Sequence, residues 1–129
     1  MNDSPTKPAE ILIVDDYADN IYLVRYLLEQ EGYQVADALS AAIAIDFVKK
    51  HPVSLILMDI QMPGMDGLQA TKIIKSFAPQ ITIVALTARL MLEDKNEMEQ
   101  AGCDGIIEKP ITDIAQFYQQ IKDYLTVKP

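Results

Sequence analysis

The sequence has no tryptophan, a single cysteine, a single histidine and no apolar run long enough to span a membrane. Cys103 alone cannot form an internal disulfide or a thiolate metal site, so we interpret it as a small hydrophobic residue in a cytoplasmic protein. The first ten residues, MNDSPTKPAE, lack the apolar stretch of a signal peptide. These shortages argue against a secreted, disulfide-stabilised domain and against a membrane protein.

Positive charge is also scarce, because 11 lysines and arginines stand against 19 acidic residues and give a formal net charge of −8. Such a surface repels a phosphate backbone or an anionic bilayer, so we expect neither nucleic acid nor a membrane as partner. The rest of the composition is ordinary for a globular protein, with 50% hydrophobic and 23% charged residues in a chain of 129. This length favours one folded domain.

Short apolar runs recur along the chain and predict the strands of a sheet. The strongest are 11–14 (ILIV), 53–58 (VSLILM) and 81–86 (ITIVAL), and weaker candidates lie at 33–36 and 105–108. Their apolarity is continuous rather than alternating, which is typical of parallel strands that are buried on both faces.

Segments with helical spacing separate these runs. The first, 18–31, places Ile21, Val24 and Leu28 on one stripe and is followed by Gly32 as a stop signal. Further helices are predicted at 41–50, 66–76 and 90–101, and a last one, with Ile114, Phe117, Tyr118, Ile121 and Leu125 on its stripe, after Thr112 or Asp113 as cap. Five repeats of strand and helix predict a doubly wound α/β sandwich.

Polar residues that could together bind a metal ion and a phosphoryl group follow four of the predicted strands. They are Asp15 and Asp16, Asp59, Thr87 and Lys109. In open α/β sheets ligands bind beyond the carboxyl ends of the strands, so these residues should meet in one crevice. Three converging carboxylates favour a hard cation such as Mg²⁺, whose coordination is often completed by phosphate oxygens. A lysine and a hydroxyl then suit the remaining oxygens of a phosphoryl group.

Each of these residues also has a local alternative role. Asp15 or Asp16 could cap the first helix, Thr87 could cap a later one, and Asp59 could open the turn that follows it. Lys109 could be a solvated surface charge. The coincidence of all of them at strand ends favours the phosphate-and-metal interpretation.

Four segments are decisive in combination: ILIVDD (11–16), LILMDIQMPGMDG (55–67), IVALTA (83–88) and AGCDGIIEKP (101–110). Their order and spacing resemble those of a response-regulator receiver domain of two-component signalling. The resemblance covers about residues 9–126 and leaves 1–8 and 127–129 as short tails, the first of them expected to be flexible. It implies a flavodoxin-like sheet of five parallel strands in the order 2-1-3-4-5, with five helices.

Carried over by position, the resemblance implies that Asp59 is the phosphoacceptor and that Thr87 and Lys109 hold phosphoryl oxygens. The Mg²⁺ ligands that it implies are Asp16, Asp59, the main-chain carbonyl of Gln61 and, through water, Asp15. It also implies a cis peptide bond between Lys109 and Pro110.

The implied partner is a histidine kinase or a histidine phosphotransfer protein. The chain would catalyse only its own phosphorylation and slow autodephosphorylation, so it is not an enzyme in the usual sense. Because the match leaves no room for an output domain, we expect the signal to leave through contact with a downstream protein, which the sequence does not identify. A homodimer through the fourth helix, fifth strand and fifth helix is a further expectation. An acidic fourth helix, with Glu93, Asp94, Glu97 and Glu99, is expected to be a solvated face that can select partners.

One position departs from the family. Receivers usually carry Tyr or Phe three residues before the lysine, whereas this chain has Ile106. The usual coupling between Thr87 and that aromatic ring cannot operate here in its ordinary form.

Two other functions use related features. A haloacid-dehalogenase-type phosphatase also has an aspartate nucleophile after a strand, but it needs a second Asp where this chain has Gln61. A flavin-binding electron carrier would need a phosphate loop rich in Ser, Thr or Gly after the first strand, where this chain has Asp15 and Asp16.

Overall fold

A computed structural model describes residues 10–126, so the predicted tails lie outside the described part of the chain. Strands and helices alternate along the whole of it. The elements are β1 (Ile11–Val14), α1 (Ala18–Gln30), β2 (Val35–Ala38), α2 (Ala41–Lys50), β3 (Leu55–Asp59), α3 (Gly67–Phe77), β4 (Thr82–Thr87), α4 (Leu92–Ala101), β5 (Gly105–Glu108) and α5 (Ile114–Thr126).

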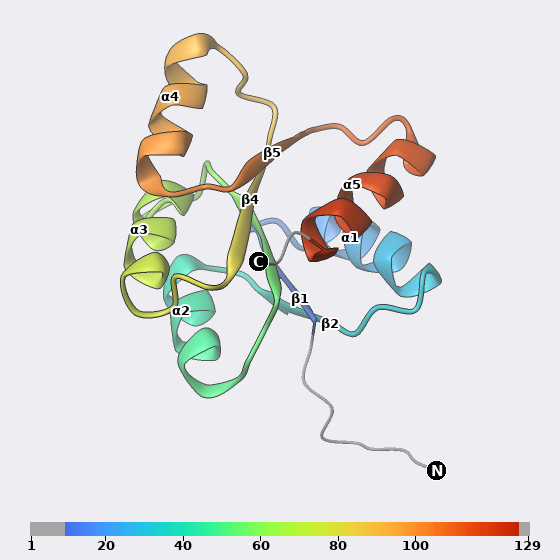
Figure 1. Cartoon of the computed structure of the whole chain (residues 1–129), viewed down its shortest axis with the longest axis horizontal. Coiled ribbons are helices and arrows are strands. Elements are labelled where there is room, and N and C mark those ends of the chain that lie inside the picture. Colours follow the sequence, from blue (N-terminus) through green and yellow to red (C-terminus); the bar gives the residue numbers. More distant parts are fainter. Residues whose placement is uncertain (1–9, 127–129) are drawn as a thin grey trace.

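The five strands form one parallel sheet in the order β2-β1-β3-β4-β5, which confirms the predicted topology. In Figure 1, α1 and α5 lie on one side of the sheet and α2, α3 and α4 on the other. The strand order changes direction next to β1, because β2 lies on one side of it and β3 on the other. In doubly wound sheets this reversal opens a crevice beyond the carboxyl ends of the central strands.

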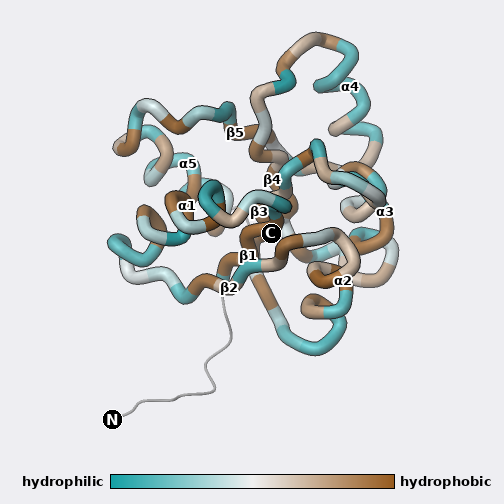
Figure 2. Tube along the Cα trace, turned by 180° about the vertical axis from the view of Figure 1, so that it is seen from behind, coloured by the Kyte–Doolittle hydropathy of each residue, from teal (hydrophilic) through white to brown (hydrophobic). Residues whose placement is uncertain are grey.

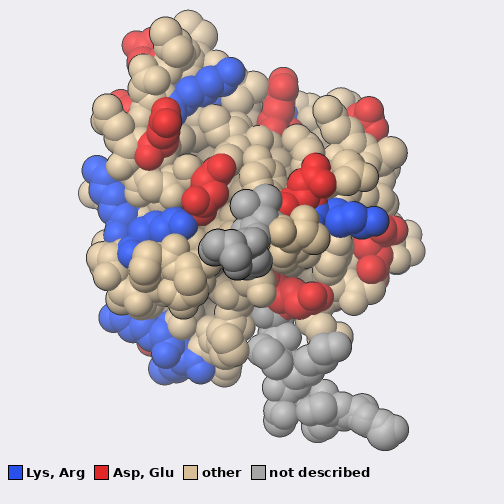
Figure 3. Space-filling view, viewed as in Figure 1, with Lys and Arg blue, Asp and Glu red and all other residues tan. Residues whose placement is uncertain are grey.

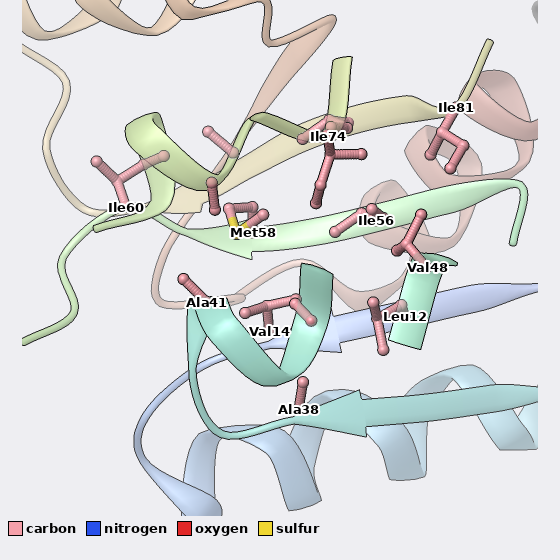
Figure 4. Packing of buried hydrophobic residues seen from close by; sticks show 14 of the residues in the cluster. Leu12, Val14, Ala38, Ala41, Val48, Ile56, Met58, Ile60, Ile74 and Ile81 are labelled. Atoms are coloured by element: carbon pink, nitrogen blue, oxygen red, sulfur yellow. The ribbon is translucent and has the colours of Figure 1, made fainter. Parts of the chain in front are cut away.

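Both faces of the sheet are buried, as the continuous apolar runs predict. Side chains that alternate along each strand enter two separate cores. One core, drawn in Figure 4, joins Leu12, Val14, Ile56 and Met58 to α2 and α3. The other joins Ile11, Ile13, Leu55 and Leu57 to α1 and α5. Figure 2 shows the resulting distribution, with hydrophobic strands inside and hydrophilic stretches on the outer turns. The central strands are therefore anchored on both sides.

The second and third strands each begin two residues later than predicted, at Val35 and Leu55. Gly32 adopts a φ of 85° and ends α1, and the N–H of Tyr33 still donates to the carbonyl of Leu28 at the end of that helix. Pairing with β1 thus starts at Val35, opposite Ile11. Hydrophobicity alone does not reveal that Tyr33 belongs to the helix end.

The fourth helix also begins two residues later than the predicted 90–101. The N–H of Met91 donates to the Asp94 carboxylate at 3.2 Å, which fixes the start of α4 at Leu92. Asp94 is consequently buried, so the expectation of a wholly solvated acidic face is wrong at this residue. Glu93, Glu97 and Glu99 are exposed as expected.

The last helix is capped at one of its two predicted residues. Asp113 caps α5, since its carboxylate accepts from the N–H of Gln116 at 3.0 Å. On the predicted stripe of α5, Phe117 and Ile121 are buried, whereas Ile114 is half exposed. Within residues 10–126, no helix has the length and apolarity required to cross a bilayer.

Candidate functional site

The predicted site residues gather at the carboxyl ends of β1, β3, β4 and β5. In the sheet register Val14 lies opposite Met58, so Asp15 and Asp59 follow side by side. Carboxylate oxygens of Asp15, Asp16 and Asp59 all lie within 4.8 Å of one another. Asp15 and Asp59 are buried, and Asp16 is exposed to solvent. This arrangement offers closely spaced oxygen ligands with an opening to solvent.

Three of the site side chains also stabilise the turns that follow their strands. The carboxylate of Asp15 accepts from the N–H of Tyr17 at 2.9 Å, and that of Asp59 accepts from the N–H of Gln61 at 3.1 Å. The Thr87 hydroxyl accepts from the N–H two residues further on, at 2.9 Å. The local roles considered from the sequence therefore coexist with convergence in the crevice, although none of the three caps a helix.

Lys109 reaches into the same crevice from the end of β5. Its Nζ lies 3.5 Å from the Asp15 carboxylate and 3.8 Å from that of Asp59. Its main-chain N–H donates to the carbonyl of Thr87 at 2.9 Å, and the peptide bond to Pro110 is cis, as the family resemblance implies. Only a quarter of its side chain is exposed, so it is not a solvated surface charge.

Thr87 is buried at the end of β4, the strand next to β3. Gln61 lies in the loop after β3, where it is exposed and its main-chain N–H donates to the Asp59 carboxylate. Gly67 closes this loop. A Cβ atom at Gly67 would collide with the main-chain carbonyl of Asp59, so only glycine fits there.

Burial raises the pKa of Asp59 to about 6, from an ordinary value of 3.8. The Lys109 ammonium and the N–H of Gln61 act in the opposite direction, while Asp15 and Asp16 raise the pKa further. Three carboxylates and one ammonium carry a formal charge of −2 when all are ionised, and one divalent cation would cancel it. The electrostatics therefore favour a cation among these oxygens.

The rest of the negative charge lies outside this crevice. On the face shown in Figure 3, acidic side chains occur over α4 and around α1 and α5, and most of the lysine and arginine side chains lie over α2 and α3, with others near α4 and α5. The acidity of the protein is thus spread over several elements.

Comparison with known proteins agrees with this geometry. The family model for the response regulator receiver domain matches residues 11–122. The chain belongs to the response regulator receiver family. This receiver domain is 38% identical over 120 residues to the polar-differentiation response regulator DivK of Brucella anthropi, an alignment that spans 92% of the chain and 97% of that relative.

Solved structures show the same fold. The chemotaxis protein CheY4 of Vibrio cholerae superposes with a TM-score of 0.84 at 26% identity, covering 92% of this chain and 99% of that one. A CheY-like receiver domain protein from Methanospirillum hungatei gives a TM-score of 0.84 at 28% identity, with coverages of 92% and 94%. The flavodoxin-like fold expected from the sequence is thereby confirmed.

Two polar residues beside the site were not predicted: Asn20, whose side-chain amide donates to the Asp15 carboxylate at 3.4 Å, and Arg89. Arg89 donates its main-chain N–H to the Thr87 hydroxyl and its guanidinium to Asp94. The signal in the sequence is only its spacing, two residues after Thr87 and five before Asp94, and that spacing has no meaning until the start of α4 is known.

Proposed function

We propose that this receiver domain accepts a phosphoryl group on the Asp59 carboxylate in the presence of Mg²⁺. The observation that carries the proposal is the position of Asp59 at the end of β3, between β1, which Asp15 follows, and β4, which ends at Thr87. An acceptor there lies beside two further carboxylates that could share a cation, and the ammonium group of Lys109 is 3.8 Å away.

The residues present fit a Mg²⁺ ion. Mg²⁺ prefers hard oxygen ligands and keeps several waters, and the three clustered carboxylates, one of them exposed, leave access for water. We assign the ion to Asp16, Asp59 and the main-chain carbonyl of Gln61, with Asp15 acting through water. When bound, the ion would neutralise negative charge on the acceptor and on the phosphoryl oxygens.

Thr87 and Lys109 complete the site from the neighbouring strands. Lys109 supplies a positive charge, and the Thr87 hydroxyl supplies a donor once it turns from its present partner. Phosphoryl transfer depends mainly on positioning and charge neutralisation, so this equipment is sufficient without a general base.

The reaction is a transfer between two proteins. A carboxylate oxygen of Asp59 attacks phosphorus, the phosphorus–nitrogen bond of a phosphohistidine breaks, and the imidazole leaves with the electron pair. The donor is a histidine kinase or a histidine phosphotransfer protein. Water later hydrolyses the acyl phosphate, so the chain modifies only itself. Contact with a downstream protein in the cytoplasm then carries the signal, and a homodimer through α4, β5 and α5 belongs to the same proposal.

Intact-mass measurement with a small acyl phosphate and Mg²⁺ tests the acceptor. We expect about one phosphoryl group per wild-type chain and none on Asp59→Asn, while Asp46→Asn, which alters an exposed aspartate on α2, is labelled like wild type. Stable label on Asp59→Asn would place the acceptor elsewhere. Continuous release of phosphate far beyond one equivalent would instead favour a phosphatase.

A further inference from the structure

Thr87 accepts two hydrogen bonds, one at its main-chain carbonyl and one at its side-chain hydroxyl. Its carbonyl accepts from the N–H of Lys109, which holds the backbone of β4 against the start of the next segment. Its hydroxyl accepts from the N–H of Arg89. Rotation about the side-chain torsion therefore changes the second contact without disturbing the first.

Arg89 carries this contact onward to α4. Its guanidinium donates to one carboxylate oxygen of Asp94 at 3.0 Å, and the other oxygen accepts from the N–H of Met91 at 3.2 Å. The Asp94 side chain is only 11% exposed, so its charge depends on these partners. A continuous chain of contacts thus connects the buried hydroxyl at the site to the first turn of α4.

The first turn of α4 has little else to hold it. Met91 and Leu92 are 67% and 75% exposed, and Met91 provides no side-chain cap. Along the whole helix the buried residues are Asp94, Met98 and Ala101, and only Asp94 lies in the first turn. The position of this turn therefore depends on the contacts of Asp94, one with the N–H of Met91 and the other with the guanidinium of Arg89.

Arg89 also has room to move. Its side chain borders an open hollow of about 450 Å³ between α4 and the loop after β3, lined among others by Gln61, Met62 and Met98. About half of the Arg89 side chain is exposed, so water can solvate its charge when it leaves Asp94.

We propose that Arg89 and Asp94 are positioning residues that couple the Thr87 hydroxyl to the first turn of α4. The proposal rests on the proposed function, because a phosphoryl group on Asp59 that recruits the hydroxyl would take it from the N–H of Arg89. The loop after β4 would then become more mobile, and the Arg89–Asp94 ion pair would weaken. This route does not require an aromatic residue on β5, where Ile106 is half-buried and packs against the core. Coupling is reciprocal, so weakening the ion pair frees the hydroxyl for the phosphoryl group.

Hydrogen exchange in the unmodified protein tests the coupling directly. The amides to follow are those of Met91 and Lys95, which donate to Asp94 and to the carbonyl of Met91. We expect Arg89→Met and Thr87→Val each to speed their exchange about fivefold, the scale of one charge-assisted bond between partly exposed groups. The double variant should exchange no faster than the faster single variant, since both changes cut one chain of contacts.

Arg89→Lys should restore most of the protection, because it keeps the charge, and Lys72→Met on α3 serves as a control that should leave these amides unchanged. The coupling would be overturned if the two substitutions had additive effects on amide exchange in the double variant. Wild-type exchange at Met91 and Lys95 in Thr87→Val would overturn it as well.

A second arm adds a small acyl phosphate with Mg²⁺ and records intact mass and exchange on the same sample. In labelled wild type, exchange at Met91 and Lys95 should rise to the level of unlabelled Arg89→Met, and labelled Arg89→Met should rise no further. Label with unchanged exchange contradicts the coupling. Absence of label contradicts the proposed acceptor instead, and the variants of the unmodified protein still decide the coupling.

Discussion

Replacing Asp59 by asparagine should stabilise the metal-free protein at neutral pH. Burial and two neighbouring carboxylates raise the pKa of Asp59 from 3.8 to about 6. The folded state therefore holds this proton to a higher pH than the unfolded chain does, and the stability that the neutral acid provides is lost as the pH rises from about 4 to above 6. A difference of about two pKa units corresponds to about 3 kcal/mol, which the uncharged amide of Asp59→Asn would recover.

Urea unfolding followed by circular dichroism, with a chelator present, measures this effect. With a slope of roughly 2 kcal/mol per molar urea, the Asp59→Asn midpoint at pH 7.5 should lie about 1.5 M above that of wild type. At pH 3.5 the two midpoints should coincide, because both side chains are then uncharged. Asp46→Asn is the matched control, since its carboxylate is exposed in an ion pair with Lys50 and its loss should change stability little at either pH.

Mg²⁺ should narrow the gap between the two proteins. A cation that binds the folded state stabilises it by mass action, and wild type keeps a ligand that Asp59→Asn lacks. The reasoning fails if Asp59→Asn is no more stable than wild type at pH 7.5 without metal, or if its advantage persists unchanged at pH 3.5.

Three further outcomes follow from contacts around the site. Gly67→Ala should lower the free energy of unfolding by about 1–3 kcal/mol, because the added methyl meets the Asp59 carbonyl; an unchanged urea midpoint would mean that the loop adapts freely. Asp66→Ala should cost about 1 kcal/mol by removing the capping box with Gln69, and an equal midpoint would show that water replaces it. Lys109→Met should move the pKa of Asp59 above about 6, since Lys109 lowers it, and a carboxyl-carbon NMR titration that shows a fall would contradict this sign.

The parallel α/β architecture and the convergence of the site residues could be predicted because both follow from strong local signals, whereas the strand order was implied by the family resemblance. Continuous apolar runs identify β1, β3 and β4, and the rule that ligands bind at the carboxyl ends of strands brings Asp15, Asp59 and Lys109 together. The two-faced burial of the sheet confirms that interpretation.

The starts of β2 and α4 were predicted wrongly because they depend on hydrogen bonds between residues close in sequence. The hydropathy of the sequence does not reveal these bonds. Tyr33 bonds back to α1 and delays β2, and Asp94 bonds back to Met91 and delays α4. No sequence pattern distinguishes the buried Asp94 from the exposed acidic residues of the same helix. Its carboxylate is paired with the N–H of Met91 and with the guanidinium of Arg89, and hydropathy reveals neither contact.

The placement of the site at strand ends has a consequence for engineering. The described site side chains come from strand ends and loops, whereas the exposed Tyr22, Leu23 and Tyr26 lie on the outer face of α1 and take no part in the crevice. The outer faces of the helices can therefore be rewritten for a new binding partner while the crevice is left intact. Such a scaffold would suit the construction of insulated synthetic signalling pairs, in which many recognition surfaces share one unchanged chemical centre.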